Sequence, residues 1–149
     1  MLFSIKEAIK QGTIVINLLS DAAQSATWLK LAPFITKCKT LYFSYGFAVI
    51  YKEDAKVVPP PDVNVILVAP KGSGCTVCLL FKEGCGINLS IAVWQDISGK
   101  AKEKAIAIGV AIGSGYMHET TFEKEVYSDS YSRCGVVGIT QYSFMMWPF

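Results

Sequence analysis

The stretch Val63–Ala69 (VNVILVA), followed directly by Pro70–Gly74 (PKGSG), decides the fold class of this 149-residue chain. A short continuous run of apolar, largely β-branched residues is typical of a strand buried on both faces of a sheet. The proline and the two glycines then predict a turn. The next segment, Cys75–Lys82, has helical composition. The sequence therefore predicts a strand–turn–helix unit of an α/β fold.

The same alternation extends to both sides of this unit. Further strands are expected at Thr13–Leu19, Thr40–Ser44, Leu89–Trp94 and Met117–Thr121. Helices are expected at Ser4–Lys10, Ala22–Ile35, Ser98–Ile112 and Phe122–Arg133, and a loop at Tyr45–Pro61. Strands that alternate with helices over short connections predict a parallel α/β sheet, which right-handed crossovers make doubly wound. Because ligands bind beyond the carboxyl ends of such strands, the candidate site loops are Ser20–Gln24, Ser44–Phe47 and Pro70–Gly74.

Composition excludes several classes of protein. Hydrophobic residues make up 52% of the chain and charged residues 17%, as in one globular domain with a real core. The formal net charge of +2 gives no reason to expect a nucleic acid or a membrane surface as partner. No apolar run reaches the roughly 18 residues that a membrane span needs. Met1–Lys10 does not resemble a secretory signal, so the five cysteines are expected to be reduced thiols in an intracellular protein.

Two segments of the chain carry candidate chemistry. Lys71-Gly72-Ser73-Gly74 resembles half of a phosphate loop without the Walker spacing, so it is either a structural turn or the seat of a catalytic lysine. Glu125 and Asp129 are four residues apart in a predicted helix, so they share a face. Two carboxylates on one face are either a Mg²⁺ site or an ordinary solvated surface.

Cysteines offer a different interpretation. Cys75 and Cys78 form a C-x-x-C pair, and Cys85 follows seven residues later. A structural zinc site needs four ligands, and a thiol at a helix N-terminus can be redox-active. Inert thiols are the alternative. The remaining candidate zinc ligands are Cys38, Cys134 and His118, the last of which is expected at the surface.

Six segments together point to a known family. They are Asn17–Ser25 (NLLSDAAQS), Thr40–Phe47 (TLYFSYGF), Val65–Gly74 (VILVAPKGSG), Ala92–Lys102 (AVWQDISGKAK), Ile112–Tyr116 (IGSGY) and Glu119–Asp129 (ETTFEKEVYSD). In this order they resemble the N-terminal domain of ketol-acid reductoisomerase (acetohydroxy-acid isomeroreductase), in its fungal and Bacteroidetes-like form. The resemblance runs from about Ser4 to Gly138, nearly the whole chain.

The resemblance implies an activity and a set of site residues. The family carries out a Mg²⁺-assisted alkyl migration in 2-acetolactate, a 2-hydroxy-3-keto acid, and then reduces the product with NADPH. This is a step of valine, isoleucine and leucine biosynthesis. Two Mg²⁺ ions polarise the substrate oxygens and stabilise the alkoxide. Carried over by motif, the expected residues are Lys71 (catalytic), Tyr45 (at the family's histidine position), Asp129 (metal ligand), and Asp21, Gln24 and Gly74 (along NADPH).

The chain departs from the family pattern at two of these positions. Tyr45 replaces the histidine, and Arg133 stands where a second metal-bridging carboxylate belongs. At an effective dielectric constant near 20 and about 5 Å, one such cation repels a divalent ion by roughly 7 kcal/mol before solvent screening. We therefore expect this chain to be inactive alone.

The resemblance also sets expectations for domain organisation. Residues 1–138 are expected to form a partial NADPH-binding domain: an incomplete Rossmann-type sheet that lacks the first βαβ unit, with its glycine-rich turn, and the helical C-terminal domain. Residues 139–149 (ITQYSFMMWPF) form a divergent apolar tail. Thr13–Leu19 should then have an unpaired edge, which favours self-association or docking on a full-length homologue. The alternatives are a non-catalytic partner chain of a reductoisomerase and a small thiol or zinc protein using Cys75, Cys78 and Cys85. The compartment is mitochondrial if the source is fungal, and otherwise cytoplasmic.

Overall fold

A computed structural model describes residues 3–131. Arg133, Cys134 and the tail 139–149 lie outside this range, so the expectations about them are not addressed. The helices are α1 (Ile5–Gln11), α2 (Asp21–Leu31), α3 (Phe47–Ile50), α4 (Lys52–Ala55), α5 (Gly74–Lys82), α6 (Ala101–Ala111) and α7 (Phe122–Tyr131), with a 3₁₀ turn η1 (Ala32–Phe34). The strands are β1 (Ile14–Asn17), β2 (Thr40–Phe43), β3 (Asn64–Pro70), β4 (Ile87–Gln95) and β5 (Ser114–Glu119).

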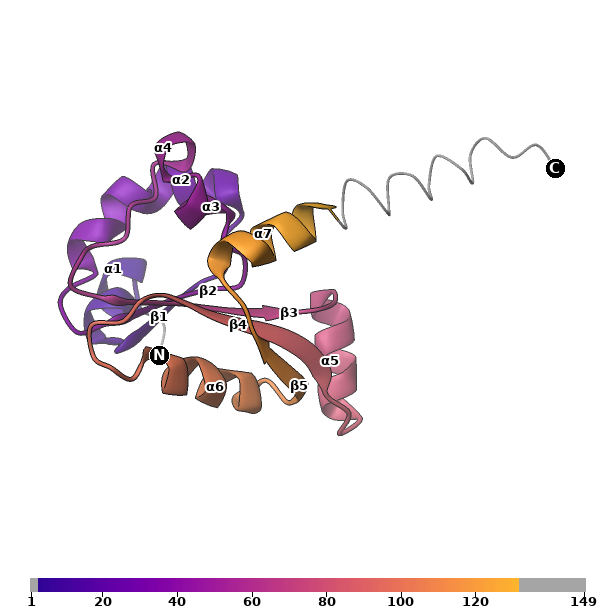
Figure 1. The fold of residues 1–149 in the computed structure, drawn as a ribbon. Helices are drawn as coiled ribbons and strands as arrows, with labels where there is room; N and C mark the ends of the chain where they lie inside the picture. The colour runs from indigo at the N-terminus through magenta and orange to yellow at the C-terminus, as the bar shows by residue number, and fades with distance from the viewer. Residues whose placement is uncertain (1–2, 132–149) are drawn as a thin grey trace.

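The strands form one sheet in the order β1-β2-β3-β4-β5 (Figure 1). Pairs β1–β2, β2–β3 and β4–β5 are parallel, as predicted, but β4 runs antiparallel to β3. The expectation of a wholly parallel sheet is therefore wrong at one position. The register pairs Pro70, at the end of β3, with Leu89, near the start of β4. The chain therefore re-enters the sheet at the end where β3 leaves it.

The reversal of β4 determines where α7 lies. Since β5 is parallel to β4, it begins beside the carboxyl end of β3 and stops at Glu119, which pairs with Ile91 in the middle of β4. The following helix α7 then crosses back over the face of the sheet (Figure 1). Phe122 at its start is buried in the main core, with its ring 5.6 Å from that of Trp94. The far half of α7 thereby reaches the carboxyl ends of β2 and β3.

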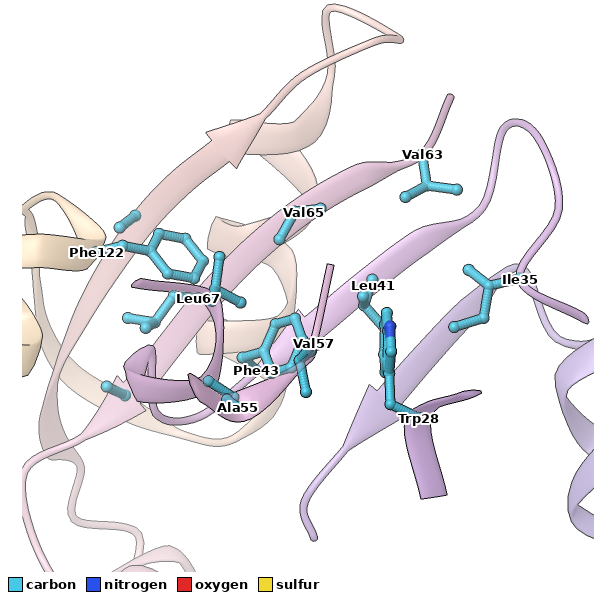
Figure 2. Close-up of a cluster of buried hydrophobic side chains, with 14 of the residues drawn as sticks. Trp28, Ile35, Leu41, Phe43, Ala55, Val57, Val63, Val65, Leu67 and Phe122 are labelled. Atoms are coloured by element: carbon cyan, nitrogen blue, oxygen red, sulfur yellow. The ribbon is translucent and has the colours of Figure 1, made fainter. Parts of the chain in front are cut away.

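The core occupies both faces of the sheet, which is the doubly wound arrangement. On one face Leu41, Phe43, Val65 and Leu67 pack against α2, α3, α4 and α7 (Figure 2). On the other face Tyr42, Ile66, Val68, Leu89 and Ile91 pack against Ala101 and Ala105 of α6. Alternate residues of β2 and β3 point to opposite faces, and both strands are buried on both faces. The prediction made from Val63–Ala69 is confirmed.

Several predicted elements differ from the structure in detail. The strand expected at Thr13–Leu19 is the edge strand β1, which is half exposed rather than buried on both faces. Among residues 3–131, β1 pairs with β2 on one side and with no strand on the other. The helix expected at Ala22–Ile35 ends at Leu31, where Pro33 cannot continue it, and the segment expected to be a loop at Tyr45–Pro61 contains α3 and α4. None of the helices within residues 3–131 is long and apolar enough to cross a membrane.

Candidate active site at the carboxyl ends of β2 and β3

A cavity of about 470 Å³ lies where β2 and β3 end. Three segments meet there: the turn after β2, the turn after β3 and the second half of α7. The lining residues are Ser44, Tyr45, Ala69, Pro70, Lys71, Gly72, Ser73, Glu125, Ser128 and Asp129. Two of the three loops singled out from the sequence therefore meet at one cavity, together with the predicted acidic helix. The cavity lining does not include Asp21, Gln24 or Gly74.

Lys71 and Glu125 form an ion pair across this cavity, between Nζ and Oε1. The Glu125 side chain is only 5% exposed, whereas that of Lys71 is 35% exposed and faces the opening. The backbone of Lys71 is fixed because its N–H donates to the Asn88 carbonyl of β4 at 2.9 Å. The pair therefore presents an ammonium group that is held by a buried carboxylate and still accessible to a ligand. Such a group can donate a hydrogen bond or a proton to a ligand oxygen.

Gly46 allows α7 to approach the turn after β2. A Cβ atom at Gly46 would stand 2.9 Å from Cδ1 of Phe122 and 3.1 Å from Cγ2 of Val126, closer than ordinary van der Waals contact. The neighbouring Tyr45 hydroxyl lies 3.2 Å from Oγ of Ser130, which joins the turn to the end of α7. Thus the residue at the family's histidine position contacts the helix that carries Glu125 and Asp129.

Two carboxylates line the cavity, and their donor set limits the metal that they could hold. Asp129 is half-buried and lies one helical turn beyond Glu125. Among residues 3–131, no group of three or more His, Cys, Asp or Glu side chains is arranged to hold a metal ion. Mg²⁺ is commonly held by one or two carboxylates together with ligand oxygens and water. Within residues 3–131 the cavity therefore offers two carboxylates, Glu125 and Asp129, and Lys71 engages the first of them.

The turn after β1 contains the first two residues expected along the cofactor. Asp21 begins α2, after Ser20 as its N-cap residue. The Gln24 side chain is buried: its Nε2 donates to the Leu19 carbonyl at 2.7 Å, and its Oε1 accepts from Nδ2 of Asn17 at 3.2 Å. In this structure Gln24 thus fixes the shape of the turn at the end of β1. A direct contact between Gln24 and a cofactor remains a prediction.

The turn after β3 leads into α5. Ser73 is the N-cap residue, and its Oγ accepts a hydrogen bond from the Thr76 N–H at 3.3 Å. Gly74, the third residue expected along the cofactor, has open space where a Cβ would lie. Gly72 is constrained, since a Cβ there would stand 2.6 Å from Cδ1 of Ile87. The turn therefore presents a small, open surface at Gly74 for a ligand.

The thiol interpretation is not supported by the structure. Cys75, Cys78 and Cys85 are exposed free thiols, and within residues 3–131 they form no metal-binding group with each other or with Cys38. His118 is exposed on β5, as expected. The described part of the chain therefore provides no zinc site built on Cys75, Cys78 and Cys85.

Sequence reasoning missed two features of this site. Glu125 was considered as a metal ligand or as part of a solvated helix face, whereas the structure buries it and pairs it with Lys71, 54 residues away. In the sequence, the one signal that pointed to Glu125 as a site residue was its spacing of four residues from Asp129. Gly46 was not singled out at all, and a glycine directly after a predicted strand and before an aromatic residue was the signal for close packing there.

The fold and the position of the site define a Rossmann-like dinucleotide-binding domain. The chain superimposes on a structure titled as an NADH-preferring ketol-acid reductoisomerase from an uncultured archaeon, with a TM-score of 0.86 and 35% identity over 96% of this chain and 45% of that chain. A semialdehyde dehydrogenase NAD-binding protein from Cupriavidus necator shares the fold alone, with a TM-score of 0.71 and 12% identity.

Sequence comparison gives the particular family. Residues 1–117 match the family described as acetohydroxy acid isomeroreductase, NADPH-binding domain. The chain is 67% identical over 134 residues to the mitochondrial ketol-acid reductoisomerase of Neurospora crassa and 62% identical over 134 residues to that of Saccharomyces cerevisiae. These matches cover 90% of this chain, which spans about a third of the length of those relatives (33% and 34%). The chain belongs to the ketol-acid reductoisomerase family and represents its nucleotide-binding domain.

Proposed function

We propose that this 149-residue chain binds NADPH as the cofactor-side part of a ketol-acid reductoisomerase site and does not convert 2-acetolactate by itself. The observation that supports the proposal most directly is the Lys71–Glu125 pair in the cavity at the carboxyl ends of the strands. This is the edge at which ligands bind in open α/β sheets. Family membership supports a nicotinamide dinucleotide as the ligand.

The residues of the cavity and of the neighbouring turns have distinct proposed parts in binding. The Lys71 ammonium group donates to an oxygen of the keto acid, and Glu125 holds that ammonium in place. Tyr45 orients the second half of α7 through Ser130. Asp21, Gln24 and Gly74 lie along the dinucleotide: the backbone at Gly74 approaches it directly, and Gln24 maintains the turn that carries Asp21. When bound, NADPH supplies a hydride to the carbonyl carbon.

The carboxylates of the site support binding better than turnover. Asp129 is proposed to hold one Mg²⁺ together with oxygens of the keto acid, and the ion then acts as a Lewis acid. The alkyl migration of the family uses two ions. Within residues 3–131 the cavity provides only two carboxylates, and Lys71 engages one of them. Arg133 adds a positive charge four residues after Asp129 in the sequence. We therefore expect the chain to bind its ligands without completing the reaction.

Calorimetric titration of the purified chain with NADPH and with NADH, each with and without Mg²⁺, tests the proposal. Both nucleotides are needed because one relative is named as NAD(+)-dependent, in Desulfosudis oleivorans. Gly74→Asp should weaken nucleotide binding at least tenfold, because it sets a negative charge against the pyrophosphate. Gly99→Asp introduces the same charge on another loop, at a residue whose φ of +69° strains any side chain. Circular dichroism therefore first checks that this variant is folded, and it should then leave nucleotide binding unchanged. Absence of binding for both nucleotides would refute the binding part.

Turnover is measured separately, by NADPH oxidation with 2-acetolactate and Mg²⁺. We expect no oxidation above the rate without protein. Conversion by the chain alone would overturn the second half of the proposal while leaving nucleotide binding intact. A mitochondrial location is likewise proposed from the fungal relatives, which are described as mitochondrial. Cell fractionation with an antibody against the chain tests it.

A further inference from the structure

The hydroxyl group of Ser44 connects the cavity at the ends of β2 and β3 with the buried core. Ser44 directly follows β2 and lines the cavity. Its Oγ lies 2.9 Å from the hydroxyl oxygen of Tyr42, a residue that is only 4% exposed. The Tyr42 hydroxyl in turn donates to the carbonyl oxygen of Val68 at 2.9 Å. Three polar groups therefore form a hydrogen-bonded chain that runs from the cavity into the core.

The buried end of this chain fixes the direction of both hydrogen bonds. A carbonyl oxygen only accepts, and a tyrosine hydroxyl carries a single hydrogen. Because Tyr42 gives that hydrogen to Val68, its oxygen must accept in the contact with Ser44. The Ser44 hydroxyl is therefore the donor, and its one hydrogen points to Tyr42 and away from the cavity.

Ser44 consequently offers a ligand in the cavity only an acceptor. A hydroxyl oxygen has two acceptor sites, and within residues 3–131 the contact with Tyr42 is the one hydrogen bond of the Ser44 side chain. Lys71, on the same cavity lining, has the opposite character, because an ammonium group only donates. The cavity thus distinguishes two ligand groups: an acceptor for Lys71 and a donor for Ser44.

The charged part of the cavity lies on the α7 side of the sheet. Every charged lining residue either belongs to α7 or pairs with it. Ser44 instead bonds to Tyr42, which packs in the core cluster against α6, on the opposite face of the sheet (Figure 1). A keto acid carboxylate and a Mg²⁺ ion suit the charged part. The uncharged dihydronicotinamide ring suits the part of the lining at Ser44.

We propose that Ser44 determines which nicotinamide ring the site accepts, because its Oγ accepts a hydrogen bond from the carboxamide N–H of that ring. The inference rests on the proposed binding of NADPH. The carboxamide is the only hydrogen-bond donor of the reduced ring, so a ring without it leaves the Ser44 acceptor unpaired, which costs affinity. Tyr42 is a positioning residue, since it acts by holding the Ser44 hydrogen away from the ligand.

Calorimetric titration with NADPH and with its reduced acetylpyridine analogue, whose acetyl group replaces the carboxamide, tests the inference. The wild-type chain should bind NADPH at least fivefold more tightly than the analogue. Ser44→Ala removes the acceptor and should weaken NADPH binding to within twofold of the analogue.

Tyr42→Phe should produce the opposite change. It releases the Ser44 hydrogen, which then donates to the acetyl oxygen, so the analogue should bind more tightly while NADPH binding stays within twofold. A merely structural effect would weaken both nucleotides by the same factor and leave their ratio unchanged. The matched control is Tyr116→Phe, which removes a hydroxyl from a residue that is 63% exposed and outside the cavity lining. It should leave the ratio unchanged.

The possible failures are distinguishable. If the wild type binds NADPH without preference over the analogue, or if Tyr42→Phe keeps the wild-type ratio, the role of Ser44 is wrong and NADPH binding stands. If Ser44→Ala weakens only the binding of 2-acetolactate to the chain with NADPH and Mg²⁺, Ser44 serves the acid hydroxyl and the assignment to the ring is overturned. Absence of binding for both nucleotides refutes the proposed function and this inference together. Circular dichroism checks folding, and Ser44→Ala decides the result if Tyr42→Phe does not fold.

Discussion

Gly46→Ala should separate the turn after β2 from α7 and destabilise the protein by a steric effect alone. The backbone of Gly46 has φ −89° and ψ −1°, which alanine adopts without strain. The added methyl group, however, would stand 2.9 Å from Cδ1 of Phe122, 3.1 Å from Cγ2 of Val126 and 3.3 Å from Cδ1 of Leu67. Phe122 and Val126 are both 1% exposed, so neither can move into solvent. The turn or the helix must therefore shift.

Overpacking of a filled core costs about 1–3 kcal/mol. For a chain of 149 residues, about 2 kcal/mol lowers the midpoint of thermal unfolding by about 4–8 °C. The assay is thermal unfolding followed by circular dichroism. Gly74→Ala is the control, since no atom lies within 4 Å of its added Cβ, and it should change the midpoint by less than 2 °C or raise it.

A second substitution identifies the cause of the loss. Val126→Ala removes the Cγ2 atom that stands 3.1 Å from the new methyl group, so it should cost less in the Gly46→Ala background than in the wild type. A coupling energy of about 1 kcal/mol is expected for side chains in direct contact. If Gly46→Ala melts within 1 °C of the wild type, or if the two substitutions are additive, the close approach of α7 is not what requires glycine.

Three further substitutions probe the fold and the site. Lys71→Met leaves the buried Glu125 carboxylate without its cation, and we expect the free energy of unfolding to fall by about 1–3 kcal/mol; chemical denaturation of the variant and the wild type at pH 7 measures the difference. Tyr42→Phe removes the hydrogen bond that the Tyr42 hydroxyl donates to the Val68 carbonyl at 2.9 Å and should cost about 1 kcal/mol. Burial raises the pKa of Tyr42 above its ordinary value of 10.0, against a smaller lowering by Ser44, so the contribution of the neutral hydroxyl is present below pH 10 and is lost as the pH rises through the raised value. The melting temperature of the wild type should therefore fall more steeply than that of Tyr42→Phe in strong alkali. Ser4→Ala should fray α1, detected as several-fold faster amide hydrogen exchange, because hydrogen bonds from the Ser4 side chain and backbone hold Glu7 and lower the pKa of its carboxyl. The capping interaction is present above the ordinary value of 4.5 and should be lost as the pH falls through the lowered value.

Local patterns in the sequence predicted the elements better than their directions. The run Val63–Ala69 is buried on both faces because its residues are apolar at every position but one, and a capping box marked the start of α1 correctly. The same kind of run at Thr13–Leu19 is half exposed, because burial depends on the neighbouring strands, and β1 has a neighbour on only one side. Apolar composition alone cannot distinguish a central strand from an edge strand.

Local patterns in the sequence could not predict the pairing of Lys71 with Glu125, because they do not show in which direction a strand runs. Periodicity gives the same signal whichever way a strand runs, and it is the antiparallel direction of β4 that sends α7 back across the sheet to Lys71. The direction of β4 therefore decides whether the acidic residues of α7 reach the lysine. The site depends on this reversal as much as on the identity of the residues that line it.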